Sequence, residues 1–233
     1  MERFLSTFTC GLICMITLPS CTTMYRAEPI EAWVVDSETG QPVEGVVVTA
    51  NWELEIGTVG GNVPVGQIMV IEAVTDKDGR FSFPAWGPKW TPLEMPNPMK
   101  SPAHLVNRDP QLLFFKSGYK WFGSENNFTV DYNTGTLRKS DWNGKTIKIQ
   151  KWKGNLKDYS WSLSLLSDSM GFAFRGENCE WKNTPRMLAL LFRETEVLQQ
   201  HGAYTGGIRG INQLPGQSGP CGSARDFLKE YLK

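Results

Sequence analysis

Apolar side chains occupy every second position in one early segment of the chain. They are Val46, Val48, Ala50, Trp52 and Leu54. A period of two is typical of a β-strand with one buried face. Strand-forming residues also dominate 30–36, 67–75 and 81–83, and turn-forming residues separate these runs. The pattern predicts a mainly β body over residues 30–153.

The segment 111–115 is apolar on both faces. Leu112 and Phe114 point to one side of a strand, and Leu113 and Phe115 point to the other. A strand of this kind is covered on both sides. The facing sheet supplies one cover, so the other comes from elsewhere in the chain or from a partner.

The pattern changes to a helical period near residue 154. Leu156, Tyr159, Leu163, Leu166 and Met170 recur at intervals of three and four, which favours a helix. Residues 159–166 also alternate strictly, so a strand stays an alternative there.

Two further helices are predicted closer to the C-terminus. Thr184 and Pro185 are suited to a helix start, and Gly202 to its end. A short helix is expected over 224–232. We expect residues 154–233 to form a helical extension on the sandwich.

We expect that extension to cover the outer face of a sheet. The residues that it is expected to cover are Trp33, Leu112 or Leu113. An apolar stripe of that size left exposed would instead be an interaction site.

The N-terminus has the layout of a signal peptide. The apolar run from Phe4 to Leu18 is shorter than the roughly 20 residues that span a bilayer. Leu18, Ser20 and Cys21 then resemble the lipobox of bacterial lipoproteins, although Pro19 departs from its usual small residue. The alternative is an ordinary secretory peptide.

The lipoprotein resemblance implies a processed and anchored chain. Residues 1–20 are removed as the signal peptide, and residues 21–29 form a lipidated N-terminus and linker. Cys21 then carries the lipid that binds the membrane, and Thr22 implies the outer membrane of the cell envelope, facing the periplasm or the exterior.

The cysteines fit an exported protein. Cys10 and Cys14 leave with the signal peptide, and Cys21 takes lipid. Cys179 and Cys221 remain as a pair in an oxidising compartment, so we expect a disulfide. In the chain-entropy model such a bridge contributes about 4 kcal/mol.

Three fragments resemble the carboxypeptidase regulatory-like domain. They are Val35-Asp36-Ser37-Glu38-Thr39-Gly40-Gln41-Pro42, Thr75-Asp76-Lys77-Asp78-Gly79-Arg80-Phe81 and Phe115-Lys116-Ser117-Gly118-Tyr119. The resemblance implies a transthyretin-like or Ig-like β-sandwich of about seven strands over 30–153, usually non-catalytic. Residues 84–110 and 120–143 are insertions relative to it.

The composition sets bounds on the chemistry. Lys+Arg and Asp+Glu balance at 24 each, which argues against a nucleic-acid binder. His104 and His201 are distant in sequence, so we expect no catalytic residue, metal site or cofactor. A carboxylate-only hydrolase stays an alternative. Its candidate groups are Glu53, Glu55, Glu72 and Glu94.

The Pro-rich insertion 84–110 contains Trp86 and Trp90, which are our candidate contact surface; the alternative is that they pack over the open end of the sandwich. The sequence predicts a non-enzymatic cell-envelope lipoprotein that acts as a binding or structural module. We expect its partner to be an envelope protein or a glycan. The alternatives are a carbohydrate-active or other envelope hydrolase, and an accessory subunit of a secretion or surface assembly.

Overall fold

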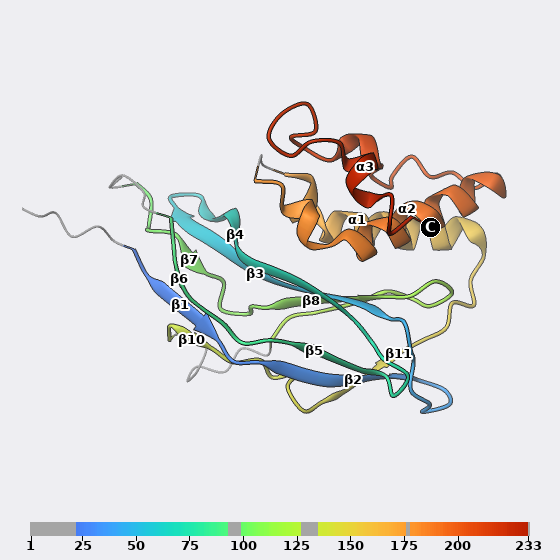
Figure 1. Cartoon of the computed structure of the whole chain (residues 1–233), viewed down its shortest axis with the longest axis horizontal. Helices are drawn as coiled ribbons and strands as arrows, with labels where there is room; N and C mark the ends of the chain where they lie inside the picture. Colours follow the sequence, from blue (N-terminus) through green and yellow to red (C-terminus); the bar gives the residue numbers. More distant parts are fainter. Residues whose placement is uncertain (1–21, 93–98, 127–134, 176–177, 233) are drawn as a thin grey trace, which may run out of the picture.

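The computed structural model describes residues 22–92, 99–126, 135–175 and 178–232. Cys21, Glu94 and the centre of the second insertion lie outside the described residues. The chain forms three layers, with two β-sheets packed face to face and helices over the outer face of one of them (Figure 1). The predicted β-sandwich with a C-terminal helical extension is confirmed.

The described residues contain more strands than the seven that were expected. The strands are β1 (Met24–Ala27), β2 (Ile30–Asp36), β3 (Val47–Thr58), β4 (Gly61–Val74), β5 (Arg80–Phe83), β6 (Trp86–Trp90), β7 (His104–Leu105), β8 (Gln111–Phe115), β9 (Phe122–Ser124), β10 (Leu137–Arg138) and β11 (Thr146–Ile149). The α-helices are α1 (Leu156–Ser169), α2 (Pro185–Gln200) and α3 (Ala224–Leu228), and the 3₁₀ turns are η1 (Gly171–Phe174), η2 (Glu180–Asn183) and η3 (Ile211–Gln213).

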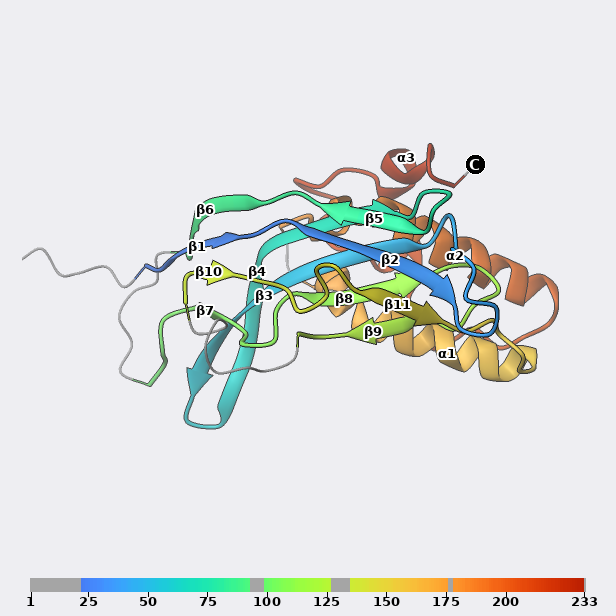
Figure 2. The ribbon, with the colours of Figure 1, turned by 90° about the horizontal axis from the view of Figure 1, so that it is seen from below.

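The first layer is built around the N-terminal strands. β2 pairs antiparallel with β5 and parallel with β11. β1 precedes β2 almost directly and pairs with β6 and β10, so the layer runs on through both groups of strands (Figure 2).

The expected linker 21–29 therefore contains a strand, which corrects that prediction. Tyr25 and Ala27 are buried on either side of the exposed Arg26. Four residues of alternation are too short a signal to separate a strand from a linker by sequence alone.

The second layer has the strand order β4–β3–β8–β9, with β7 also paired to β3. Its inner face meets the first layer in a continuous apolar core. Val48, Ala50 and Trp52 point inward from β3, and Leu112 and Phe114 point inward from β8. The alternation predicted for both strands is the reason that one face of each enters this core.

The outer face of the second layer is covered by the helices. Val47, Leu113 and Phe115 belong to one core cluster with Leu163 of α1 and Leu188 of α2. The helical extension is thus the second cover that the doubly apolar strand requires.

Two of the three residues expected beneath the helices lie elsewhere. Leu112 faces the inner core, and Trp33 lies on β2 in the other sheet. Whether a residue occupies an odd or an even position along its strand decides which face of the sheet its side chain is on. The sequence alone does not tell which of the two faces the helices cover.

Residues 156–169 are helical, so the strand alternative for 159–166 is excluded. Asn155 caps α1 by accepting a hydrogen bond from the Asp158 N–H at 2.9 Å. Tyr159 joins α1 to α2, since its hydroxyl donates to the buried Glu194 carboxylate at 2.8 Å. α3 ends at Leu228, four residues earlier than expected.

The start of α2 is capped by a residue from the sheet. Thr184 makes no side-chain capping bond. Instead the Glu72 carboxylate on β4 accepts hydrogen bonds from the backbone N–H groups of Arg186 and Met187, at 3.0 and 2.7 Å. A negative charge at a helix N-terminus is favourable, so Glu72 fixes the helical layer to the sheet.

The three fragments of the domain resemblance meet through hydrogen bonds. Tyr119 donates its hydroxyl proton to Asp36 at 3.3 Å, and Thr75 donates to the Val43 carbonyl at 2.7 Å. The Val34 N–H donates to the carbonyl of Gly79. Gly79 has φ of +71°, and a Cβ there would collide with the Val34 carbonyl.

The two insertions are tied together by a buried polar cluster. Arg138 on β10 pairs with Asp109, and its Nη2 donates to the Val106 carbonyl at 2.7 Å. Asn126 donates to the Asp109 carbonyl and to the Lys139 carbonyl. The insertions are thus ordered parts of the sandwich rather than loops alone where they are described, and β6, β7, β9 and β10 belong to them.

Removing either partner of the buried Asp109–Arg138 pair should make the protein easier to unfold. We expect Asp109→Ala and Arg138→Ala each to lower the free energy of unfolding by about 3–5 kcal/mol, because each leaves an uncompensated buried charge. Urea unfolding measures this loss. Arg80→Ala is the matched control, since it breaks the exposed pair with Glu31 and should cost less than about 1 kcal/mol. Equal losses in the three variants would contradict the prediction.

Asp36 should make stability depend on acid pH. The N–H groups of Thr39 and Glu38 hold the pKa of Asp36 below its ordinary 3.8. A lowered folded-state pKa stabilises the fold above the ordinary value, and this contribution is lost as the pH falls through the lowered value. Unfolding of the wild type and Asp36→Asn from pH 7 to pH 2 should therefore give a difference that shrinks below about pH 4. A difference independent of pH would argue against it.

Candidate functional site

A groove lies between the start of α1 and the segment that follows α2. Its volume is about 600 Å³. Its lining residues are Leu156, Lys157, Ser160, Trp161, Ser164, His201, Gly202, Ala203, Tyr204, Gly206 and Gly207. The lining is mainly apolar with a few polar groups, which is the usual make-up of a ligand site.

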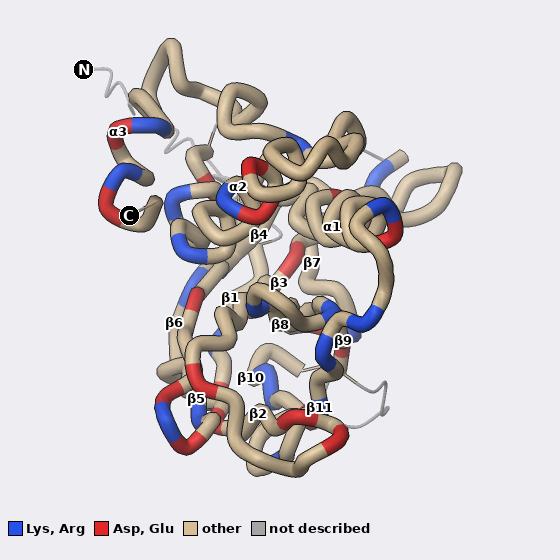
Figure 3. Tube along the Cα trace, turned by 90° about the vertical axis from the view of Figure 1, so that its right-hand side faces the viewer, with Lys and Arg blue, Asp and Glu red and all other residues tan. Residues whose placement is uncertain are grey.

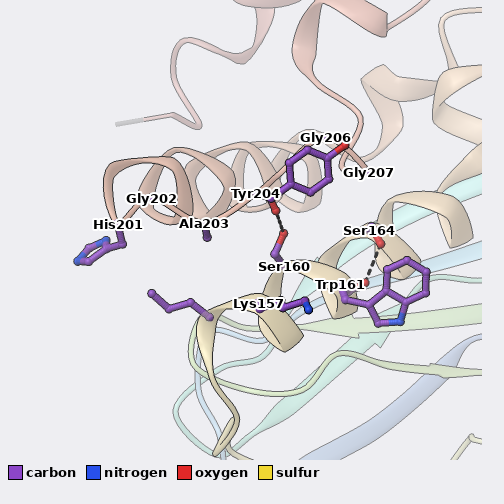
Figure 4. Close-up of a pocket in the computed structure, with 11 residues that line it drawn as sticks. Lys157, Ser160, Trp161, Ser164, His201, Gly202, Ala203, Tyr204, Gly206 and Gly207 are labelled. Atoms are coloured by element: carbon purple, nitrogen blue, oxygen red, sulfur yellow. Dashed lines mark hydrogen bonds between the residues drawn. The ribbon is translucent and has the colours of Figure 1, made fainter.

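Two aromatic rings stand at the rim of this groove. Trp161 projects from α1 and Tyr204 from the segment after α2, as Figure 4 shows. The residues are 67% and 83% exposed, respectively. Trp and Tyr are large and rigid with a polar tip, and they dominate the energy of many binding surfaces. Neither ring was predicted from the sequence, because residues 161 and 204 are distant in sequence and lie outside the helical stripe.

The two walls of the groove are held together by backbone contacts. Ser160 Oγ on α1 donates to the Tyr204 carbonyl and so joins the two walls, whereas Ser164 Oγ donates to the Trp161 carbonyl within α1 at 2.7 Å (Figure 4). A Cβ on Gly207 would lie 3.1 Å from the Ser164 Cβ, and one on Gly206 would meet the Tyr204 ring. The glycines thus let the segment approach α1 and leave room for the ring.

The two histidines lie in different parts of the structure. His201 lies at the groove, where its Nδ1 is 2.8 Å from the Val197 carbonyl. His104 lies on β7, with its Nε2 3.3 Å from the Glu55 carboxylate. No group of three or more His, Cys, Asp or Glu side chains in the described parts of the chain is placed to hold a metal ion.

The candidate carboxylates have different surroundings. Glu72 caps α2, as described above. Glu55 accepts from the Asn62 amide at 2.8 Å in addition to its His104 contact. Glu53 lines a smaller pocket of about 160 Å³ with Arg175 and Glu180. Glu94 lies outside the described residues.

Burial raises the pKa values of the two carboxyl groups in the small pocket. It raises the pKa of Glu53, an effect that the Arg175 charge opposes and the neighbouring Glu55 reinforces. Burial also raises the pKa of Glu180. The pocket therefore combines two carboxyl groups of raised pKa with one guanidinium group.

The candidate contact surface at Trp86 and Trp90 is divided. Trp86 is buried against Trp52, with ring centroids 5.4 Å apart in an edge-to-face arrangement. This is the packing alternative, so Trp86 cannot be part of a contact surface. Trp90 stays 63% exposed at the end of β6. Positions 86 and 90 have the same parity along β6. They differ because Trp86 lies within the core, whereas Trp90 lies beyond its edge.

Cys179 and Cys221 are joined in a disulfide with their Cα atoms 5.4 Å apart. Cys179 directly precedes η2 and Cys221 lies just before α3, so the bridge connects the regions before the second and third helices as expected. Gly216 passes against Cys221, where a Cβ would collide with the sulfur. The lipidation residue Cys21 lies outside the described residues.

Comparisons with known proteins find solved structures that resemble only part of this chain. No family model matches the chain, and no curated protein matches it. The 3-chlorocatechol 1,2-dioxygenase of Rhodococcus opacus 1CP is 16% identical with a TM-score of 0.27, and covers 56% of this chain and 60% of its own. The chlorocatechol 1,2-dioxygenase of Pseudomonas putida is 16% identical with a TM-score of 0.28, and covers 56% and 61%.

A third structure is the C-terminal domain of the shaft pilin spaA of Lactobacillus rhamnosus GG. It is 13% identical with a TM-score of 0.24, and covers 56% of this chain and 99% of its own. Our chain thus spans about three fifths of each dioxygenase. The assignment as a sandwich rests on the two packed sheets of the chain itself.

Proposed function

We propose that the protein is a lipid-anchored, non-enzymatic binding module of the cell envelope, and that it holds a glycan in the groove between α1 and residues 201–207. The observation that carries the proposal is the pair of exposed rings, Trp161 and Tyr204, at the rim of that groove. The sandwich acts as the scaffold that presents the groove.

A glycan fits the chemistry of the groove. A sugar ring has an apolar C–H face, which stacks on an aromatic ring, and hydroxyl groups at its edge. Trp161 and Tyr204 supply aromatic faces, and Lys157 and the Tyr204 hydroxyl supply polar groups beside them. The glycines 202, 206 and 207 leave backbone N–H and carbonyl groups without side chains over them.

The position of the groove agrees with an anchor at Cys21. β1 begins at one end of the molecule, whereas α1 begins and α2 ends at the other (Figure 1). A chain held to a membrane by Cys21 would present the groove away from that membrane. No helix in the described residues combines the length and apolar character needed to cross a bilayer.

The carboxypeptidase regulatory-like resemblance supports a scaffold role. Its fragments are joined by hydrogen bonds from Tyr119 to Asp36 and from Thr75 to Val43. None of these residues lines the groove. We propose that the protein is a divergent module of this kind, in which the helical layer carries the binding site.

Glycan binding is tested by truncating the rings. We expect Trp161→Ala and Tyr204→Ala each to weaken binding to the native host's peptidoglycan or surface polysaccharide at least about tenfold, since a central aromatic anchor contributes about 1.4 kcal/mol or more. Calorimetry or a glycan array measures the affinity of the full-length purified protein. The melting temperature should stay close to that of the wild type, because both rings are exposed.

Leu165→Ala is the matched control for these variants. Leu165 is an exposed apolar residue on α1, one turn beyond Trp161 and outside the groove lining. It should leave glycan affinity unchanged. If the wild type binds no glycan, or if all three variants bind equally, the proposal is wrong. Cross-linking to one dominant envelope protein would instead support the accessory-subunit alternative.

The anchor is tested by mass. Protein purified from its native membrane should have the mass of the chain from Cys21 onward plus acyl groups, and reduction should add about 2 Da for the two thiols of the Cys179–Cys221 bridge. Cys21→Ser should abolish the acyl mass and release the protein from the membrane. An unmodified full chain, or a mature chain without lipid, would contradict the lipoprotein assignment.

The hydrolase alternative has one specific observation in its favour, the raised pKa of Glu53 in the small pocket. A raised pKa is typical of a carboxyl group that acts as a general acid. If the protein cleaves a glycan in the small pocket, Glu53→Gln should abolish cleavage, whereas Trp161→Ala, in the separate groove, should not. Absence of turnover with every bound glycan would leave the binding module.

A further inference from the structure

We propose that the end of the sandwich beside Cys21 seats the protein on the bilayer, with Val59, Val63, Val65 and Trp90 entering the interfacial region of the phospholipids. These four residues are called the seating surface below. The inference rests on the proposed lipidation of Cys21, and it adds a second, non-covalent contact with the same membrane.

The first part of the seating surface is the tip of the β3–β4 hairpin. Val59 is 84% exposed, and Val63 and Val65 on β4 are exposed as well. The chain carries no Asp, Glu, Lys or Arg between Glu55 and Glu72. Long exposed edge strands are normally protected by charge or proline, and β4 forms the edge of its sheet. Pro64 is the single proline in that stretch.

The second part is the end of β6. Trp90 pairs with Met24 at the start of β1. Next to this pair, the Thr91 N–H donates to the Thr23 carbonyl at 2.9 Å, and the Thr23 N–H donates to the Thr91 hydroxyl at 2.9 Å. Trp90 and Thr91 are therefore held to the chain three and two residues after Cys21.

This pairing limits the distance between the seating surface and the membrane. Two extended residues span at most about 7 Å, so Thr23 stays within that distance of the Cys21 Cα. The lipid on Cys21 lies in the bilayer, which brings the β1 end of the molecule against the headgroups. Trp is favoured at this depth, where one part of its ring is apolar and the N–H is wet.

The distribution of charge agrees with this orientation. In the turn after β2, Glu38 pairs with Lys153, and the turn before β5 contains Lys77 and Asp78. Both turns lie at the end of the molecule that faces the viewer in Figure 3, where charges of both signs are interspersed. The hairpin tip is at the opposite end together with the start of β1 (Figures 1 and 2).

A basic residue accompanies the apolar hairpin. The backbone of Lys100 forms an isolated antiparallel β-bridge with Thr58 next to the tip, and the Ser101 N–H donates to the Gly57 carbonyl at 2.9 Å. A lysine beside apolar side chains is suited to a phosphate headgroup. The bilayer, rather than a second copy of the chain, is therefore the occupant that fits both the apolar tip and its neighbouring cation.

The test places an environment-sensitive dye at single sites of the full lipidated protein in phosphatidylethanolamine–phosphatidylglycerol vesicles. Val63→Cys and Trp90→Cys probe the seating surface, and Lys77→Cys at the opposite end is the matched control. The other cysteines of the exported chain are Cys21, lipidated under the proposal, and the bridged Cys179 and Cys221, so the introduced thiol takes the dye.

We expect the dye at residues 63 and 90 to shift to shorter wavelength and to be quenched by bromolipids several-fold more than at residue 77. Vesicle flotation in the same samples reports the anchor separately. If the protein floats but all three dyes stay in water, the seating surface is wrong and the anchor stands. If the protein does not float and carries no acyl mass, both are wrong. Dye–dye contact between molecules without bromolipid quenching would overturn the proposal in favour of pairing of β4 with a second copy.

Discussion

The architecture depends on a sheet that is apolar on both faces. β3 and β8 send Trp52 and Phe114 into the sandwich core and Val47 and Leu113 toward the helices. Burial of apolar surface is worth roughly 25 cal/mol per Å², so neither face is stable in water. The first layer covers the inner face, and the C-terminal helices cover the outer one. The extension is thus part of the fold and not an appendage to it.

Three contacts keep that outer layer in one position. Glu72 accepts from the first N–H groups of α2, the Tyr159–Glu194 hydrogen bond joins α1 to α2, and the disulfide connects the region before η2 with that before α3. Burial and the Glu194 contact raise the pKa of the Tyr159 hydroxyl, so it stays a donor at neutral pH. The groove lies between the start of α1 and the segment that follows α2, so its shape follows from where these contacts fix the two helices.

Much of the fold could be predicted from the sequence, because long alternating or helical runs of apolar residues are a strong signal. The strands at 30–36 and 111–115 and the helix starting at Pro185 match the structure closely. The strands β1, β7 and β10 are too short to have a period, and the Asp109–Arg138 pair joins two segments that look like loops. The groove was not predictable, because Trp161 and Tyr204 come to line the same groove only through the packing of the helical layer. The burial of Trp86 but not Trp90 depends in the same way on neighbours from β3.

The parallel pairing of β2 with β11 has a consequence for biogenesis. It aligns Val34 with Ile147, and β1 likewise pairs with β10 across almost as long a stretch of chain. The first sheet therefore cannot close until more than a hundred further residues are available. Such distant pairing is slow to form, so under the proposed export the chain would still be unfolded while it is threaded through a translocation pore. The topology thus suits a polypeptide that crosses first and folds afterwards.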